Sequence, residues 1–213
     1  LLSCSERLSR IRKNFKQLQC KIAQLSVIRQ EACNFNDNSI IAMNKRPEAG
    51  DFSPYYQPYI DKVEGDNALH VLQDKQDAMY RFWESIPDDK WTYRYEANKW
   101  TPKEMLLHII DAERVFAYRA LRIARKDKIN LLGFDHDNFV VNSEANNRPI
   151  ATLLKEYSSV RNATICLFES FTEDMWSEKG SASEHAVTTL ALAYIISGHE
   201  LHHVGILKER YLS

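Results

Sequence analysis

The chain has 213 residues, 44% of them hydrophobic, so it can bury the core of one full domain. A net charge of −1 gives no electrostatic footprint for nucleic acid, and no apolar run approaches the roughly 18 residues of a membrane span. Few Gly and Pro argue against a turn-rich all-β fold. The four Cys form no CxxC pair, which predicts neither a disulfide framework nor a Cys-type zinc site and favours a reducing cytoplasm.

Residues 1–42 differ from the rest of the chain. They hold seven basic and three acidic residues, a net +4, which leaves −5 for residues 43–213. Apolar residues at steps of three and four predict an amphipathic helix here. Met43 resembles a natural start of translation. Two interpretations therefore stay open: a helical extension that packs on the domain or on a partner, or upstream sequence that is not part of the native protein.

The segment 47–64 is predicted to be an extended arm over the core. It holds Pro54 and Pro58, and its Tyr rings (Tyr55, Tyr56 and Tyr59) can anchor it.

Helical periodicity predicts four long helices, which together suggest a four-helix bundle. They run from a cap at Asp66 to about Ser85, from a cap at Thr101 to about Lys126, from about Pro149 to Ser170, and from about Thr188 to Tyr211. The second has the clearest start, because Thr101, Pro102 and Glu104 form a capping box. An extended aromatic link (Trp91, Tyr93, Tyr95), a polar loop at 133–138 and a short turn of helix at 172–180 connect them.

The last helix carries the most informative motif, at residues 198–203. His199 and His203 are four residues apart and share one helix face, so they can form half of a transition-metal site. His108 on the second helix can supply a third imidazole if the two helices pack together. His199 with His202, three apart, is a weaker alternative pair.

Three imidazoles would leave open coordination positions, which is typical of a catalytic metal site. The ligand set accepts Zn²⁺, Ni²⁺ or Fe²⁺. Glu104, Asp111 and Glu200 are candidates to hold a ring N–H.

Residues 199–203 also match H-E-x-x-H, the metalloprotease helix in which Glu200 would activate water. Only ten residues follow His203, too few for the usual downstream third ligand.

The other polar candidates are less specific. His136 and His185 could approach the mouth of a site, although surface positions are the simpler expectation, as for His70. The second helix also carries four arginines, one of which could bind an anionic cosubstrate: Arg114, Arg119, Arg122 and Arg125.

Several stretches together resemble the DinB-like superfamily, which includes YfiT-like metal-dependent hydrolases and bacillithiol S-transferases. They are Trp100-Thr101-Pro102-Lys103-Glu104, His108-Ile109-Ile110-Asp111-Ala112-Glu113-Arg114, Tyr118-Arg119-Ala120-Leu121-Arg122, Gly133-Phe134-Asp135 and Gly198-His199-Glu200-Leu201-His202-His203. The resemblance covers residues 43–213.

The resemblance implies an all-α, up-down-down-up four-helix bundle, often a homodimer, whose divalent metal is held by His108, His199 and His203. Together with the H-E-x-x-H match, it leaves three hypotheses. The first is a cytoplasmic enzyme acting on small molecules, which joins a low-molecular-weight thiol to an electrophile or hydrolyses a substrate at the same site. The second is a non-catalytic, stress-linked metal-binding bundle, and the third is a metalloprotease. No nucleic-acid or membrane partner is expected.

Overall fold

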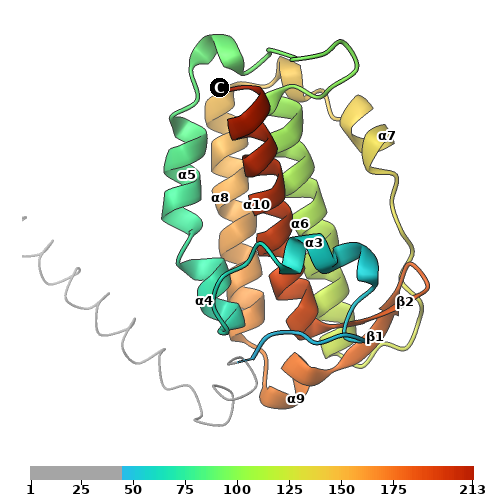
Figure 1. The fold of residues 1–213 in the computed structure, drawn as a ribbon. Helices are drawn as coiled ribbons and strands as arrows, with labels where there is room; N and C mark the ends of the chain where they lie inside the picture. Colours follow the sequence, from blue (N-terminus) through green and yellow to red (C-terminus); the bar gives the residue numbers. More distant parts are fainter. Residues whose placement is uncertain (1–44) are drawn as a thin grey trace, which may run out of the picture. The chain divides into compact units, whose positions relative to one another are not determined.

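The computed structural model describes residues 45–213, so the expectations for residues 1–42 lie outside the described residues. The bundle is built from α4 (Ala68–Gln73) continued by α5 (Gln76–Glu84), α6 (Pro102–Ala124), α8 (Ile150–Glu169) and α10 (Thr189–Arg210). In Figure 1 the α4–α5 segment runs up, α6 and α8 run down, and α10 runs up. The predicted all-α, up-down-down-up four-helix bundle is confirmed.

The long connection between α6 and α8 follows from this topology. These helices are neighbours and run the same way, so the chain must return along the length of the bundle between them. Residues 125–149 make that return and contain the short helix α7 (His136–Val141) and the 3-10 turn η3 (Ala145–Asn147). The predicted polar loop is thus partly helical, because the Asp135 carboxylate accepts a hydrogen bond from Asn138 N at 3.0 Å and caps α7.

The start of α6 is as predicted. Thr101 Oγ1 accepts from Glu104 N at 3.2 Å, Glu104 Oε2 accepts from Thr101 N at 2.8 Å, and Pro102 occupies the first turn. Because this capping box sets where the helix begins, it also sets which face His108 occupies about two turns later.

The first predicted helix is wrong in two details. It breaks at residues 74–75 into α4 and α5, and its cap is Asn67, whose side chain accepts from His70 N at 2.8 Å, rather than Asp66. The aromatic link is a loop after the 3-10 turn η2 (Asp88–Lys90) rather than an extended strand. Trp91 in this loop is buried and stacks on Trp83 at 6.3 Å between ring centroids, closing one end of the bundle.

A β-hairpin follows α8 that the sequence did not predict. After α9 (Glu173–Ser177), strands β1 (Lys179–Ala182) and β2 (His185–Thr188) pair antiparallel. Its two turn residues, Ser183 and Glu184, have φ of 53° and 66° without being Gly or Asn, so the usual hairpin signature is absent. Gly180 packs so closely on α6 that a Cβ there would lie 2.5 Å from Ile123 Cγ1.

The N-terminal arm is partly helical rather than extended. It forms the 3-10 turn η1 (Pro54–Tyr56) and α3 (Gln57–Ile60), which crosses α10 in Figure 1. The closest approach is at Gly198, where a Cβ would lie 2.1 Å from Tyr59 O. Only a residue without a side chain permits this contact, which places the Tyr59 ring beside the histidines of α10.

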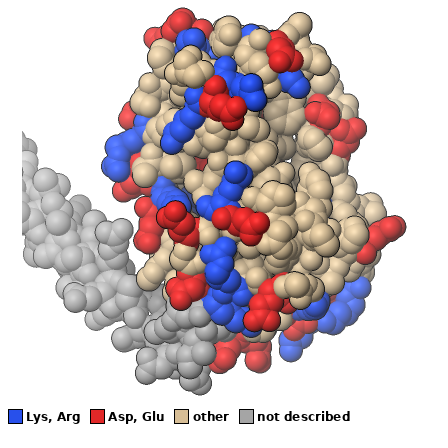
Figure 2. Space-filling model, in the orientation of Figure 1, with Lys and Arg blue, Asp and Glu red and all other residues tan. Residues whose placement is uncertain are grey.

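Charged side chains of both signs cover the surface. Basic and acidic side chains are interspersed over the face shown in Figure 2, and Lys128 pairs with Glu178 at 2.7 Å. The N-terminal half of α10, by contrast, is buried all round. Among the described helices none is both long and apolar enough to cross a membrane.

Candidate metal centre

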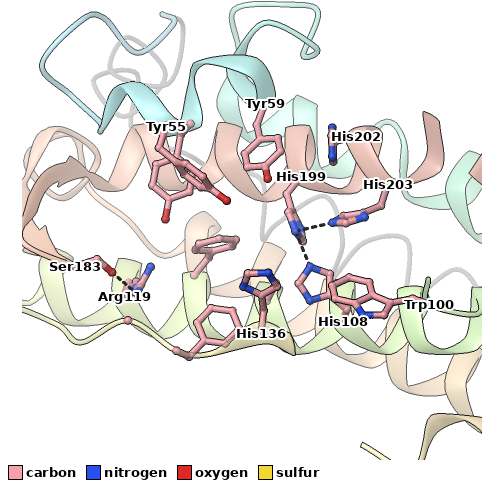
Figure 3. Close-up of a pocket in the computed structure, with 15 residues that line it drawn as sticks. Tyr55, Tyr59, Trp100, His108, Arg119, His136, Ser183, His199, His202 and His203 are labelled. Atoms are coloured by element: carbon pink, nitrogen blue, oxygen red, sulfur yellow. Dashed lines mark hydrogen bonds between the residues drawn. The ribbon is translucent and has the colours of Figure 1, made fainter. Parts of the chain in front are cut away.

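Three histidines from two helices converge on one point. His108 comes from α6, and His199 and His203 come from adjacent turns of α10. His199 Nε2 lies 3.0 Å from His108 Nε2 and 3.1 Å from His203 Nε2 (Figure 3). One ligand atom from each ring lies within 4.8 Å of the others, and the residues are only 7%, 6% and 9% exposed. We call these three residues the histidine cluster.

Burial keeps the histidine cluster neutral. It lowers the pKa of His108 to about 4, with a smaller contribution from the nearby His136. It also lowers the pKa of His199 and His203 well below the usual value, and neighbouring imidazoles add to that effect. Neutral imidazoles are the form that binds metals, because a nitrogen lone pair is then available.

Hydrogen bonding alone does not satisfy the histidine cluster. His199 Nε2 faces two other Nε2 atoms, yet a single proton can serve only one of these contacts well. A cation would accept lone pairs from all three, and the 3.0 and 3.1 Å spacings allow one ion to lie between His199 and each neighbour at the roughly 2.0–2.1 Å of zinc–imidazole bonds. The donor set therefore fits a divalent transition metal.

The predicted carboxylate supports of the histidines are not formed. Glu104 instead bonds Arg94 and Asn146, each at 2.8 Å, and Asp111 bonds Arg114 at 3.2 Å. Within residues 45–213 the buried His203 Nδ1 has no hydrogen-bond partner. Aromatic rings orient the imidazoles instead.

Glu200 points away from the histidine cluster into the bundle. Its Oε1 accepts from the Tyr157 hydroxyl at 2.6 Å and its Oε2 from Arg161 Nη2 at 3.0 Å. Arg161 also donates to Glu113 through Nε and Nη2, both at 2.9 Å, and is 1% exposed. We call Glu113, Tyr157, Arg161 and Glu200 the ion network. Glu200 is thus held by α8 and cannot activate water beside His199 and His203, which removes the basis of the metalloprotease hypothesis.

The histidine cluster lies at one end of a cavity of about 360 Å³. Trp100 tilts over His108 at 4.7 Å between ring centroids and stacks on His203 at 6.1 Å, and Tyr59 meets His199 edge-on at 5.5 Å. The remaining aromatic walls are Tyr55, Tyr56, Phe116 and Phe134. These rings flank the histidines without sealing them from the cavity.

The other histidines have different places. His202 lines the cavity and contacts Tyr59 at 5.2 Å, but it is not part of the histidine cluster, so the alternative pair with His199 is not formed. His136, at the start of α7, is half exposed and reaches the cavity, with its ring 5.8 Å from His108. His70 and His185 are exposed and do not line it.

Among the four arginines predicted on the second helix, only Arg119 lines the cavity. Arg114 pairs with Asp111, Arg122 pairs with Asp127, and Arg125 is exposed. The sequence did not single out Arg119, because its burial depends on the unpredicted hairpin that brings Ser183 beside it.

Comparisons with known proteins agree with this geometry. The family model of the DinB superfamily matches residues 72–207, more than half of the chain. The fold is similar to the solved structure of YfiT from Bacillus subtilis, described as a probable metal-dependent hydrolase with an unusual four-helix bundle topology. The two are 14% identical, with a TM-score of 0.55, over 82% of this chain and 98% of that one, a likeness that shows the fold alone. No protein of curated function matches.

Proposed function

The chain belongs to the DinB superfamily, and from this premise we propose that it is a metal-dependent enzyme whose His108, His199 and His203 hold one divalent metal. One observation carries the proposal: three buried Nε2 atoms converge without adequate partners, at the end of an open cavity. Three imidazole donors accept Zn²⁺, Ni²⁺ or Fe²⁺.

The residues of the site have distinct tasks in this proposal. A divalent metal held by the three histidines would supply Lewis-acid activation and would lower the pKa of a bound thiol or water. The histidine cluster stays neutral to hold it, while Trp100 and Tyr59 restrict the rotation of the imidazoles. Aromatic walls limit the water that enters beside the substrate.

The cavity favours a thiol over water as the nucleophile. No Asp or Glu of the described residues lines it, so a carboxylate base for hydrolysis is missing there. A thiol needs less help, because its unperturbed pKa of about 8.5 is far below that of water. His136 and His202 line the cavity outside the histidine cluster and are the bases available there to accept a thiol proton. We therefore propose transfer of a low-molecular-weight thiol to an electrophile, with hydrolysis at the same site as the alternative.

A non-catalytic metal-binding bundle is the second candidate. A metal with a purely structural role would be expected to be sealed off by aromatic side chains, whereas the aromatic rings here leave one side of the histidine cluster open to the cavity.

The family resemblance also supports the proposals of a homodimer and of a small-molecule substrate.

The test is conjugation by the full chain loaded in turn with Zn²⁺, Ni²⁺ or Fe²⁺. Each form is incubated with cysteine, glutathione or coenzyme A and the electrophile chlorodinitrobenzene. Metal-dependent conjugation that His203→Ala abolishes would support the transferase. Conversion of activated esters without any thiol would favour the hydrolase, and inactivity of every loaded form in both assays would favour the non-catalytic bundle.

A further inference from the structure

Arg119 is a buried cation without an acidic partner at the far end of the cavity. The residue is 3% exposed, and its Nη2 donates to Leu132 O at 2.9 Å and to Ser183 Oγ at 3.3 Å. No carboxylate within residues 45–213 forms an ion pair with it, in contrast to Arg161. Its Nε–H is enclosed and unpartnered. A buried charge in this state is expensive unless a ligand compensates it.

The surroundings of Arg119 are suited to bind an anion. Two neutral oxygens accept hydrogen bonds from Nη2, and the Tyr56 hydroxyl lies close enough to the guanidinium to interact with it. Arg119 and Tyr56 both line the cavity, so a ligand oxygen can accept from either. The Phe116 ring, 5.8 Å from the guanidinium carbon, forms the wall next to them.

The charge count favours a monoanion. Arg119 is the only arginine among the described lining residues, and no lysine joins it. A carboxylate would be neutralised by this single guanidinium, whereas a phosphate dianion would keep uncompensated charge in a largely aromatic cavity.

The distance between the two ends sets the length of the ligand. Arg119 follows His108 by eleven residues on α6, roughly 16 Å along the helix axis. Long helical side chains lean toward the N-terminus, so the guanidinium and the histidine cluster are separated by on the order of 10 Å, the reach of about three extended residues. Figure 3 shows Arg119 and Ser183 at one end of the cavity and the three histidines at the other.

We propose that Arg119 and Tyr56 form a carboxylate subsite, and that the substrate or cosubstrate is an elongated monoanion with its reactive group at the histidine cluster. The placement of the reactive end rests on the proposed function. The carboxylate subsite does not, because it is made by residues of this chain that are distant from the metal ligands.

The test compares straight-chain alkanoates with alkanols of the same length, from butyl to dodecyl, by calorimetric titration of the full chain. Each series is measured after chelator treatment and after loading with Zn²⁺, against wild type, Arg119→Gln and the control Arg125→Gln. Arg125 directly follows α6, is exposed and does not line the cavity, so its variant removes an equal charge away from the site. Circular dichroism melting confirms that each variant is folded. If Arg119→Gln does not fold, Tyr56→Phe replaces it and should reduce the preference.

Wild type and Arg125→Gln should bind the alkanoate at least about tenfold more tightly than the alkanol, with or without Zn²⁺, and Arg119→Gln should lose this preference. An alkyl phosphate series should bind no better than the alkanoates. Equal binding of alkanoate and alkanol by wild type would overturn the proposal. So would a preference that appears only with Zn²⁺ and survives Arg119→Gln, because the carboxylate would then be a metal ligand. Loss of metal binding in His203→Ala tests the proposed function separately.

Discussion

The histidine cluster and the ion network meet on α10, where His199 and Glu200 are neighbours in sequence. The two sets differ in whether their buried polar atoms have hydrogen-bond partners. Glu200 has every oxygen occupied, by Tyr157 at 2.6 Å and Arg161 at 3.0 Å. His199, its neighbour in sequence, faces only two other imidazole nitrogens. Buried polar groups are normally satisfied within the fold, so the unsatisfied set is the one expected to bind something else. The same helical turn therefore has one side that is satisfied within the fold and one side that we propose binds a metal.

The largest effect should come from removing the cation of the ion network. Arg161→Met leaves Glu113 and Glu200 buried without a positive charge, so the free energy of unfolding should fall by about 3–5 kcal/mol. Urea denaturation of metal-free protein measures it. Arg114→Met, which breaks exposed pairs with Asp111 and Glu156, is the matched control and should change stability by less than about 1 kcal/mol. Equal losses of unfolding free energy in the two variants would show that the ion network does not stabilise the fold more than an exposed ion pair does.

Acid should destabilise the metal-free protein through the histidine cluster. Unfolded histidines bind protons near pH 6.5, whereas folded His108 does so only near pH 4. Between these values the unfolded state holds more protons, so the free energy of unfolding should fall as the pH falls, by on the order of 3 kcal/mol for His108 alone. Above pH 6.5 both states are neutral and this contribution is constant.

The measurement is urea denaturation at a series of pH values in the presence of a chelator. His108→Gln should show a shallower loss of stability between pH 6.5 and 4 than wild type, whereas the exposed control His70→Gln should follow wild type. Identical slopes for His108→Gln and wild type would show that His108 is not held neutral by burial.

A smaller loss of stability is expected from a substitution at the contact between the N-terminal arm and α10. Gly198→Ala places a Cβ against Tyr59 O and should displace α3, lowering stability by about 1–3 kcal/mol. Gly205→Ala on the same helix meets no atom within 4 Å and should stabilise by up to about 1 kcal/mol through helix propensity. Thermal unfolding followed by circular dichroism compares them, and a stabilising Gly198→Ala would contradict the close contact between arm and helix.

The features predicted from sequence are those with local causes. The capping box at Thr101 defined the start of α6, and the spacing of His199 and His203 defined a shared face. The three-histidine arrangement then required only that α6 and α10 pack together, which the structure shows. Its role as a metal site stays a prediction.

The features missed from sequence depend on contacts between distant segments. Arg119 is buried by Leu132 and Ser183, and the hairpin that carries Ser183 lacks the usual turn residues. The partners of Glu200 come from α8, so a five-residue motif match could not reveal that its carboxylate faces away from the histidines. The break between α4 and α5 occurs without Gly or Pro, so no local signal marked it.

Elemental analysis of the purified full chain tests the central claim most directly. Wild type should hold about one divalent metal per chain, as a three-ligand site would. His203→Ala should lose it, and His202→Ala should keep it, because His202 lines the cavity without joining the histidine cluster. Equal metal content in wild type and His203→Ala, or loss only in His202→Ala, would contradict the account.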